Sequence, residues 1–354
     1  MKEIKTIQNE FKKKSRNMEW ERGVRSWDWK VLLKSKPSET LKARDFATNI
    51  IWYDGKPGAV RIYDIQKTNS ATQKRFVKLL QSQGKHTSKS VFTQQAHAKT
   101  HIVIDIKSNS KVRLDFTNQL FDYWGCVYLR IGKNAEVEIR DTHSIQDAPF
   151  GGASVFVDVG AGASVRYHIE AYAKYTYQSH YVFYLAKCST LTALQQMSPQ
   201  TTQLHTHHVV HSGVETKTSH TWMLDAHKQS HVYGNIVNYH KAKHTTADVV
   251  VKSVGRNRAN VKIDGWIDIG KKALDTNSYL QQDVLLLSEK ANVRAVPNLE
   301  ILNNDVVASH GATLGMVDEQ QLRYLQSRGL SKKLAEKVII KGFLKSASER
   351  YNRK

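Results

Sequence analysis

Nine histidines between residues 205 and 244 are the side chains of this chain whose type could do metal chemistry. If this segment is a strand, His205, His207 and His211 share one face, because side chains an even number of residues apart point the same way. Neutral imidazoles ligate transition metals. No carboxylate or cysteine stands at a familiar ligand spacing, so histidines on the polar face of a β-helix are the alternative. The nine are His205, His207, His208, His211, His220, His227, His231, His240 and His244.

The only two cysteines, Cys126 and Cys188, are isolated and lack CxxC spacing. This pattern argues against a zinc ribbon and against a resident metal cluster held by four thiolates. We expect both thiols to be buried in strands. The glycines of residues 160–162 stand between two expected strands, so they predict neither a Walker nor a Rossmann phosphate loop. No nucleophile–base pairing stands out, and we expect no catalytic residues.

The composition of the 354 residues is that of a globular chain, with 40% hydrophobic and 24% charged residues and a net charge of +21. The charge is spread along the chain without interleaved aromatic and basic residues, so we interpret it as a surface property rather than a nucleic-acid site. No stretch is long and apolar enough to span a bilayer. Residues 1–14 lack the apolar core of a secretory signal. We therefore expect a soluble, cytoplasmic protein without a membrane partner.

Residues 101–302 predict strand after strand. Apolar residues alternate with other residues at Ile102, Ile104 and Ile106, and again along residues 261–269. Period-two alternation is typical of half-buried strands. No helical stretch of about 10–15 residues separates these strands, which argues against a βαβ sheet.

A turn phrase recurs between the expected strands. Residues 131–137, 159–165 and 287–293 each have an apolar residue, a polar or glycine turn, a small residue and a new strand, and residues 254–261 repeat the phrase with one residue added. Repetition of this kind favours stacked coils of a β-helix, in which each coil buries its apolar face on the next. The irregular spacing leaves a sandwich or a jelly roll open.

Both ends of the chain predict helices. Residues 1–64 are expected to be partly helical, with Trp20, Val24 and Trp27 on one helix face. In residues 316–354, Asp318 with Gln321 resembles a capping box. The second C-terminal helix is expected to carry an inward stripe of Leu334, Val338, Ile339 and Phe343. These ends bracket a core of residues 65–315.

Three motifs near the C-terminus resemble the SufB/SufD family of iron–sulfur cluster assembly scaffolds. They are Pro-Asn-Leu-Glu-Ile at residues 297–301, Ser-His-Gly-Ala-Thr at residues 309–313 and Tyr-Leu-Gln-Ser-Arg-Gly-Leu at residues 324–330. They occur in order and at close spacing, and the resemblance extends over about residues 245–343. Ser-His-Gly-Ala-Thr is more similar to the SufD branch.

The resemblance implies a mainly β fold: a right-handed parallel β-helix core with N-terminal and C-terminal helical segments. It also implies that two such β-helices associate, as a SufB-like and a SufD-like subunit or as a self-paired dimer. Each C-terminal helical region would dock a SufC-like ABC-type ATPase. On this chain the resemblance assigns docking to Asp318, Glu319, Leu322, Tyr324, Leu325, Arg328 and Gly329. The alternative is that these residues pack a helical cap on the last strand.

His310, with Ser309 beside it, is the candidate cluster-assembly residue that the resemblance indicates. We expect it in a short turn between the last strand and the C-terminal helices, at an interface where a partner supplies thiolate and carboxylate. The alternative is a histidine that fixes the turn. Ala308 stands where many members of the family have cysteine, so we expect no resident cofactor and at most a transient iron–sulfur cluster.

The expected function is therefore a non-catalytic scaffold subunit of a SUF-type assembly complex. A basic β-helix that binds or cleaves acidic polysaccharide is an alternative from another class. A nucleic-acid binder is a third, and it would show steep salt dependence.

Overall fold

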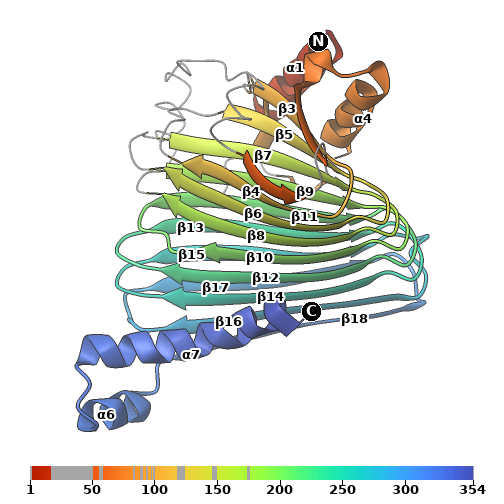
Figure 1. Cartoon of the computed structure of the whole chain (residues 1–354). Helices are drawn as coiled ribbons and strands as arrows, with labels where there is room; N and C mark the ends of the chain where they lie inside the picture. Colours follow the sequence, from red (N-terminus) through yellow and green to blue (C-terminus); the bar gives the residue numbers. More distant parts are fainter. Residues whose placement is uncertain are drawn as a thin grey trace.

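The chain forms a solenoid of two stacked sheets, with helices at both ends of the sequence (Figure 1). The structure is a computed structural model. It describes residues 2–16, 51–55, 59–82, 84–87, 91–92, 95–96, 98, 100–117, 124–145, 150–173 and 176–353. The helix expected around Trp20, Val24 and Trp27 lies outside these residues.

Each sheet contains nine strands among the described residues. Sheet A consists, in spatial order, of β1 (Ile51–Gly55), β4 (Ser110–Thr117), β6 (Glu136–Ile145), β8 (Ser164–Ala173), β10 (Thr190–Met197), β12 (Lys217–Ala226), β14 (Thr246–Gly255), β16 (Thr276–Leu286) and β18 (Val306–Met316). Sheet B consists of β17 (Asn292–Ile301), β15 (Asn260–Ile269), β13 (His231–His240), β11 (Thr202–His211), β9 (Thr176–Leu185), β7 (Phe150–Val159), β5 (Trp124–Ile131), β3 (Thr100–Ile106) and β2 (Val60–Asp64).

From β3 onward the strands alternate between the two sheets along the chain, and each pairs in parallel with the strand two positions further on. Val261 of β15, for example, pairs with Val232 of β13 on one side and Val293 of β17 on the other. At the N-terminal end of the stack, β1 pairs antiparallel with β4 and β2 pairs antiparallel with β3. This topology confirms the predicted parallel β-helix and rules out the sandwich and the jelly roll. Two of the strands, β1 and β2, lie within residues 1–64, the segment that was expected to be partly helical.

The turns of the solenoid stack on one another through backbone hydrogen bonds. At one corner a residue with positive φ donates its N–H to the carbonyl of the next turn; Gly162 donates to Lys187 at 2.9 Å and Cys188 to Val214 at 2.9 Å. Left-handed backbone suits glycine, asparagine and aspartate, which explains the recurring turn phrase. The residues of this corner are Asn134, Gly162, Cys188, Glu215, His244 and Asp275.

The two cysteines lie in different surroundings. Cys126 is buried as expected, and burial raises the pKa of its thiol to about 12. Cys188 is exposed in a turn, and its thiol donates a hydrogen bond to Glu215. The expectation of a second buried strand thiol was wrong, because the small side chain occupies a left-handed turn position rather than a strand.

Helices from the N-terminal segment cover the outer face of sheet B. They are α1 (Lys2–Arg16), the 3₁₀ turn η1 (Ile65–Lys67) and α4 (Ser70–Gln81). Phe76 of α4 is buried against Tyr128 and Phe156 of the sheet. A buried apolar layer between helices and sheet contributes on the order of 1.5–3 kcal/mol for each large side chain.

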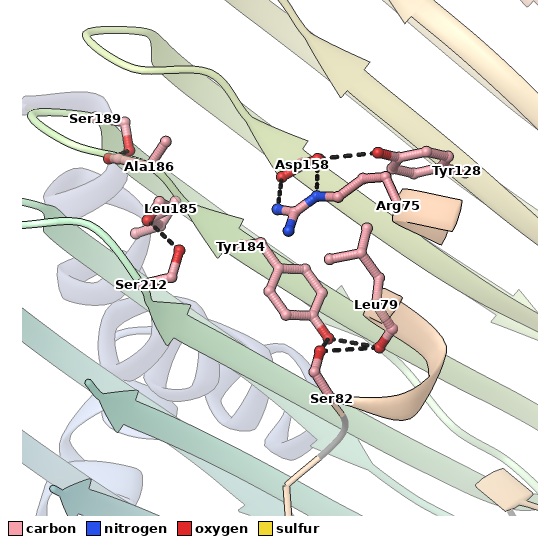
Figure 2. A network of polar contacts seen from close by, with 10 residues as sticks. All are labelled: Arg75, Leu79, Ser82, Tyr128, Asp158, Tyr184, Leu185, Ala186, Ser189 and Ser212. Atoms are coloured by element: carbon pink, nitrogen blue, oxygen red, sulfur yellow. Dashed lines mark hydrogen bonds and ion pairs between the residues drawn. The ribbon is translucent and has the colours of Figure 1, made fainter. Parts of the chain in front are cut away.

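A polar network fixes α4 on the sheet (Figure 2). The guanidinium of Arg75 donates to both carboxylate oxygens of Asp158, at 2.8 and 2.6 Å, and the hydroxyl of Tyr128 donates to the same carboxylate at 2.9 Å. Tyr184 donates to the carbonyl of Leu79 at 2.8 Å near the end of the helix. An ion pair and apolar packing therefore both hold α4 on the outer face of sheet B.

Two helices follow the solenoid: α6 (Glu319–Ser327) and α7 (Lys332–Arg353). Asp318 caps α6, as expected, by accepting from Gln320 N–H at 2.8 Å. α7 lies along the outer face of sheet A, where Arg166 donates to the carbonyl of Tyr351 at 2.9 Å.

The face of α7 that packs inward differs from the expected stripe. Ala335, Ile340, Ala347 and Tyr351 are buried. Leu334 and Val338 are exposed, and Ile339 and Phe343 are half-buried. Small alanine side chains allow the helix to approach the sheet closely, so the largest apolar residues do not mark the contact.

Candidate functional site

The solenoid ends in an open rung formed by β17 and β18, which we call the terminal rung. In the described part of the chain, each of the two strands is the last of its sheet and pairs with a neighbour on one side only. Apolar side chains lie exposed along it, including Val307 at 68% and Leu314 at 60% exposure. An edge strand with unpaired backbone groups and exposed apolar residues is a template for pairing with another chain.

His310 lies in the middle of β18, opposite Leu280 of β16. The predicted turn at this position was wrong, because the strand continues to Met316. Val306 and Ala308 pack against the buried core from β18, and alternation places His310 on the same face. The imidazole is exposed because no further rung covers it. Ser309 is also exposed and alternates to the outer face, so the two candidate residues do not share a face.

The predicted docking residues gather on and around α6, which stands away from the two sheets (Figure 1). None of the residues of α6 is buried, and Tyr324 is 63% exposed. Packing of the helix on the last strand would bury one side of it, so the helical-cap alternative is not supported. Leu322 and Leu325 are half-buried. Gly329 adopts a φ of +92° directly after the helix, which is the expected left-handed end.

The surface charges of α6 are paired locally. Arg323 donates to Glu319 at 2.8 Å, four residues earlier in the same helix. Arg328 is exposed at the C-terminal end, and its backbone N–H closes the last turn on Tyr324 at 3.2 Å. The helix and its C-terminal end thus expose the ring of Tyr324 and the guanidinium of Arg328. Tyrosine and arginine are both enriched at protein–protein interfaces.

His205, His207 and His211 are fully buried between the two sheets. The interpretation that places them on a polar outer face was wrong. Each has separate partners: His205 Nδ1 lies 2.8 Å from Ser179, His207 Nδ1 lies 3.1 Å from Nε2 of His220, and His211 Nδ1 lies 2.8 Å from Thr216. Their nitrogens do not meet at one point, so the structure does not gather them into one ligand set.

Burial keeps these imidazoles neutral. It lowers the pKa of His205 and of His220 to about 3, and that of His240 to about 3 as well. The pKa of His207 falls well below its ordinary value through burial and the neighbouring His220. The row of interior histidines therefore acts as neutral hydrogen-bonding groups at neutral pH.

A buried carboxylate lies in the same interior and was missed by the sequence. Asp141 of β6 accepts hydrogen bonds from the hydroxyls of Tyr167 and Tyr181, each at 2.8 Å, and its Oδ1 lies 2.8 Å from Nε2 of His143. These residues come from β6, β8 and β9. Asp141 and His143 are two residues apart on one strand, but no local spacing could have linked them to the two tyrosines, because only the fold brings β6, β8 and β9 together.

These features define a parallel β-solenoid with an open terminal rung and a projecting C-terminal helix. The family described as "SUF system FeS cluster assembly, SufBD core domain" matches residues 121–343. The chain belongs to this family, as the motifs indicated.

Relatives from staphylococci are similar over part of the chain. A protein of Staphylococcus haemolyticus and one of Staphylococcus aureus, each named as an iron-sulfur cluster assembly SufBD family protein, are 34% identical to it over 105 residues. The similar stretch covers 30% of this chain and 23% of each relative. The chain thus spans less than a quarter of the relatives' length at this similarity.

Helices in the described part of the chain do not include one with the length and apolar character needed to cross a bilayer.

Proposed function

We propose that this chain is a SufD-like, non-catalytic scaffold subunit that pairs through its terminal rung and docks a SufC-like ABC ATPase through α6. The observation that carries the proposal is the open terminal rung with His310 exposed on its inward face. The iron–sulfur cluster is the cargo of this scaffold rather than a resident cofactor.

Pairing through the terminal rung is supported by its backbone and its apolar surface. A second rung placed against β17 and β18 would take up their unpaired N–H and C=O groups. It would also cover Val307 and Leu314, whose burial contributes on the order of 25 cal/mol per Å² of apolar surface removed from water. The partner is either a SufB-like subunit or a second copy of this chain.

The side chains of β18 limit what this chain can give to a cluster. Ala308 and His310 share the inward face of β18. His310 can offer one imidazole nitrogen there, whereas the methyl group of Ala308 cannot ligate iron. Iron–sulfur clusters require thiolate or imidazole ligands around each iron. A thiolate at this place would have to come from a SufB-like partner, because a second copy of this chain would bring another Ala308. This supports the SufD-like assignment and favours a SufB-like partner over self-pairing.

Docking of the ATPase is proposed for the exposed side of α6. Tyr324 and Arg328 are exposed there without a role in packing the solenoid. α7 holds α6 in place, because its own buried residues fix it to sheet A. A rigid α7 would transmit movement of a docked ATPase to the outer face of sheet A, two strands from the terminal rung.

The pairing proposal is tested by sedimentation of the purified chain, alone and with a SufB-like chain from the same genome. The double substitution Val307→Lys and Leu314→Lys should abolish pairing, because two ammonium groups would face an apolar interface. Val338→Lys is the matched control, since Val338 is an exposed apolar residue that belongs to α7 and not to β17 or β18. Pairing that survives the double substitution, or that is lost equally in the control, would refute the proposed interface.

A further inference from the structure

We propose that His86, Asp268 and Glu300 form a binding site for a divalent transition-metal ion on the outer face of sheet B. Asp268 of β15 and Glu300 of β17 are direct register partners on neighbouring strands. Ile267 and Ile269, which flank Asp268, are buried inward, so alternation points both carboxylates outward. His86 approaches them from the segment 84–87. This site is separate from the terminal rung's inward face and does not depend on the proposed pairing.

The distances between the three groups suit an ion better than a hydrogen bond. Nε2 of His86 lies 3.5 Å from Oδ2 of Asp268 and 4.0 Å from Oε2 of Glu300, and one ligand atom from each residue lies within 4.8 Å of the others. Hydrogen bonds of this type are about 2.7–3.2 Å long. Ligand atoms around a tetrahedral zinc ion stand about 3.3 Å apart, given metal–ligand bonds of about 2.0–2.1 Å.

The imidazole is held in place before any ion binds. The ring of His86 stacks on Trp266 with centroids 4.0 Å apart. The side-chain amide of Asn235 donates to the backbone carbonyl of His86 at 2.7 Å. Its backbone N–H donates to the hydroxyl of Tyr239 at 3.3 Å. Nε2 is enclosed and makes no hydrogen bond to any residue that the structure describes. A nitrogen that is buried, oriented and without a hydrogen bond, and that faces two carboxylates, is a preorganised ligand.

A cation already occupies the space between the carboxylates. The ammonium group of Lys85 lies 3.4 Å from Asp268 and forms a close ion pair with Glu300. Burial alone would raise the pKa of Asp268, but the contacts with His86 and Lys85 outweigh it and lower that pKa. The side chain of Lys85 is 51% exposed, so it can swing into water and give its place to a doubly charged ion.

The ligand set indicates the class of ion. One imidazole nitrogen with two carboxylates suits Zn²⁺, Fe²⁺, Co²⁺ or Mn²⁺, whereas Ca²⁺ and Mg²⁺ prefer oxygen ligands alone. Three protein ligands leave a fourth position for water or a transferable ligand. The competing interpretation is an ion-pair clamp, in which Lys85 and His86 only fasten segment 84–87 to the sheet.

The two interpretations predict different effects of Lys85→Gln on Co²⁺ affinity. If the site binds metal, Lys85→Gln should tighten the binding of Co²⁺ by roughly tenfold, because a competing positive charge is lost. Glu300→Gln should weaken it by about 10–100-fold, because a ligand is lost. If the residues form only a clamp, both substitutions lower the melting temperature and neither changes Co²⁺ affinity.

The experiment uses the full-length chain, freed of metal by a chelator and titrated with Co²⁺ by visible absorption and with Zn²⁺ by equilibrium dialysis. All variants carry His310→Ala, so that the terminal rung contributes no imidazole. Asp264→Asn is the matched control, because Asp264 pairs with Lys262 on the same strand without an imidazole. The expected result is one high-affinity Co²⁺ site. Its affinity should rise in Lys85→Gln, fall in Glu300→Gln and stay unchanged in Asp264→Asn. Absence of that site in the wild-type sequence, or equal affinities for Lys85→Gln and Glu300→Gln, would overturn the proposal.

Discussion

Mild acid is predicted to unfold this protein, because neutral histidines are buried inside the solenoid and beneath the N-terminal segments. Burial lowers the pKa of four fully enclosed imidazoles to about 3, against an ordinary value of 6.5; they are His205, His208, His220 and His240. The unfolded chain takes up a proton at each of them below pH 6.5, whereas the folded chain does not. Their contribution to stability is therefore complete above about pH 7 and is lost as the pH falls from 6.5 towards 3.

The size of the effect follows from the same linkage. At pH 5 each histidine is about 1.5 pH units below its unfolded pKa, which costs about 2 kcal/mol. The four together cost on the order of 8 kcal/mol, comparable with the whole unfolding free energy of about 5–15 kcal/mol of a typical domain. Carboxylates with lowered pKa, such as Asp268 and Asp283, weaken the fold only at still lower pH.

Thermal unfolding followed by circular dichroism at pH 5, 6, 7 and 8 measures this dependence. The melting temperature should be level from pH 8 to 7 and should fall steeply between pH 6.5 and 5. His205→Gln keeps a hydrogen-bonding group and should flatten the fall, whereas His244→Gln, at an exposed turn position, should not. A melting temperature that is the same at pH 7 and pH 5 would refute the reasoning.

Two further predictions concern the packing of the solenoid. Gly213→Ala should destabilise the fold strongly, because the added Cβ would lie 2.1 Å from the backbone nitrogen of Lys187; Gly315→Ala, where nothing lies within 4 Å, should leave the melting temperature unchanged. Arg75→Ala should cost about 1–3 kcal/mol in urea unfolding, because Asp158 loses its charged partner, and equal stability of the variant would disprove the role of this pair.

The sequence pattern was sufficient for many of the strands, and it favoured their stacking into a β-helix without excluding a sandwich or a jelly roll. Alternation over residues 261–269 predicted β15 nearly to its ends, and the turn phrases predicted the corners where Asn134 and Gly162 adopt positive φ. These features are local, because strand period and turn geometry depend on neighbouring residues. The capping pattern at Asp318 predicted the start of α6, whereas the resemblance to the family drew attention to His310 but placed it in a turn rather than in β18.

The local sequence pattern could not predict which side chains face the interior of the solenoid. Both faces of β11 are buried, one by sheet A and the other by the N-terminal segments, so the alternation of His207 and His208 does not tell inside from outside. The set of His86, Asp268 and Glu300 joins positions far apart in the sequence. Only the register of β15 with β17 brings its two carboxylates together.

Capture of the ATPase tests the proposed scaffold role most directly. The full-length chain is co-expressed with the SufC-like ATPase of the same genome, purified by affinity and sized at low and at moderate salt. The control carries Tyr324→Ala and Arg328→Glu, which change exposed residues of α6 and its C-terminal end and leave the buried contacts of α7 intact. The account predicts one ATPase retained per scaffold chain and loss of the ATPase in the control. An ATPase that fails to bind the unaltered chain, or that binds the control equally well, would contradict it.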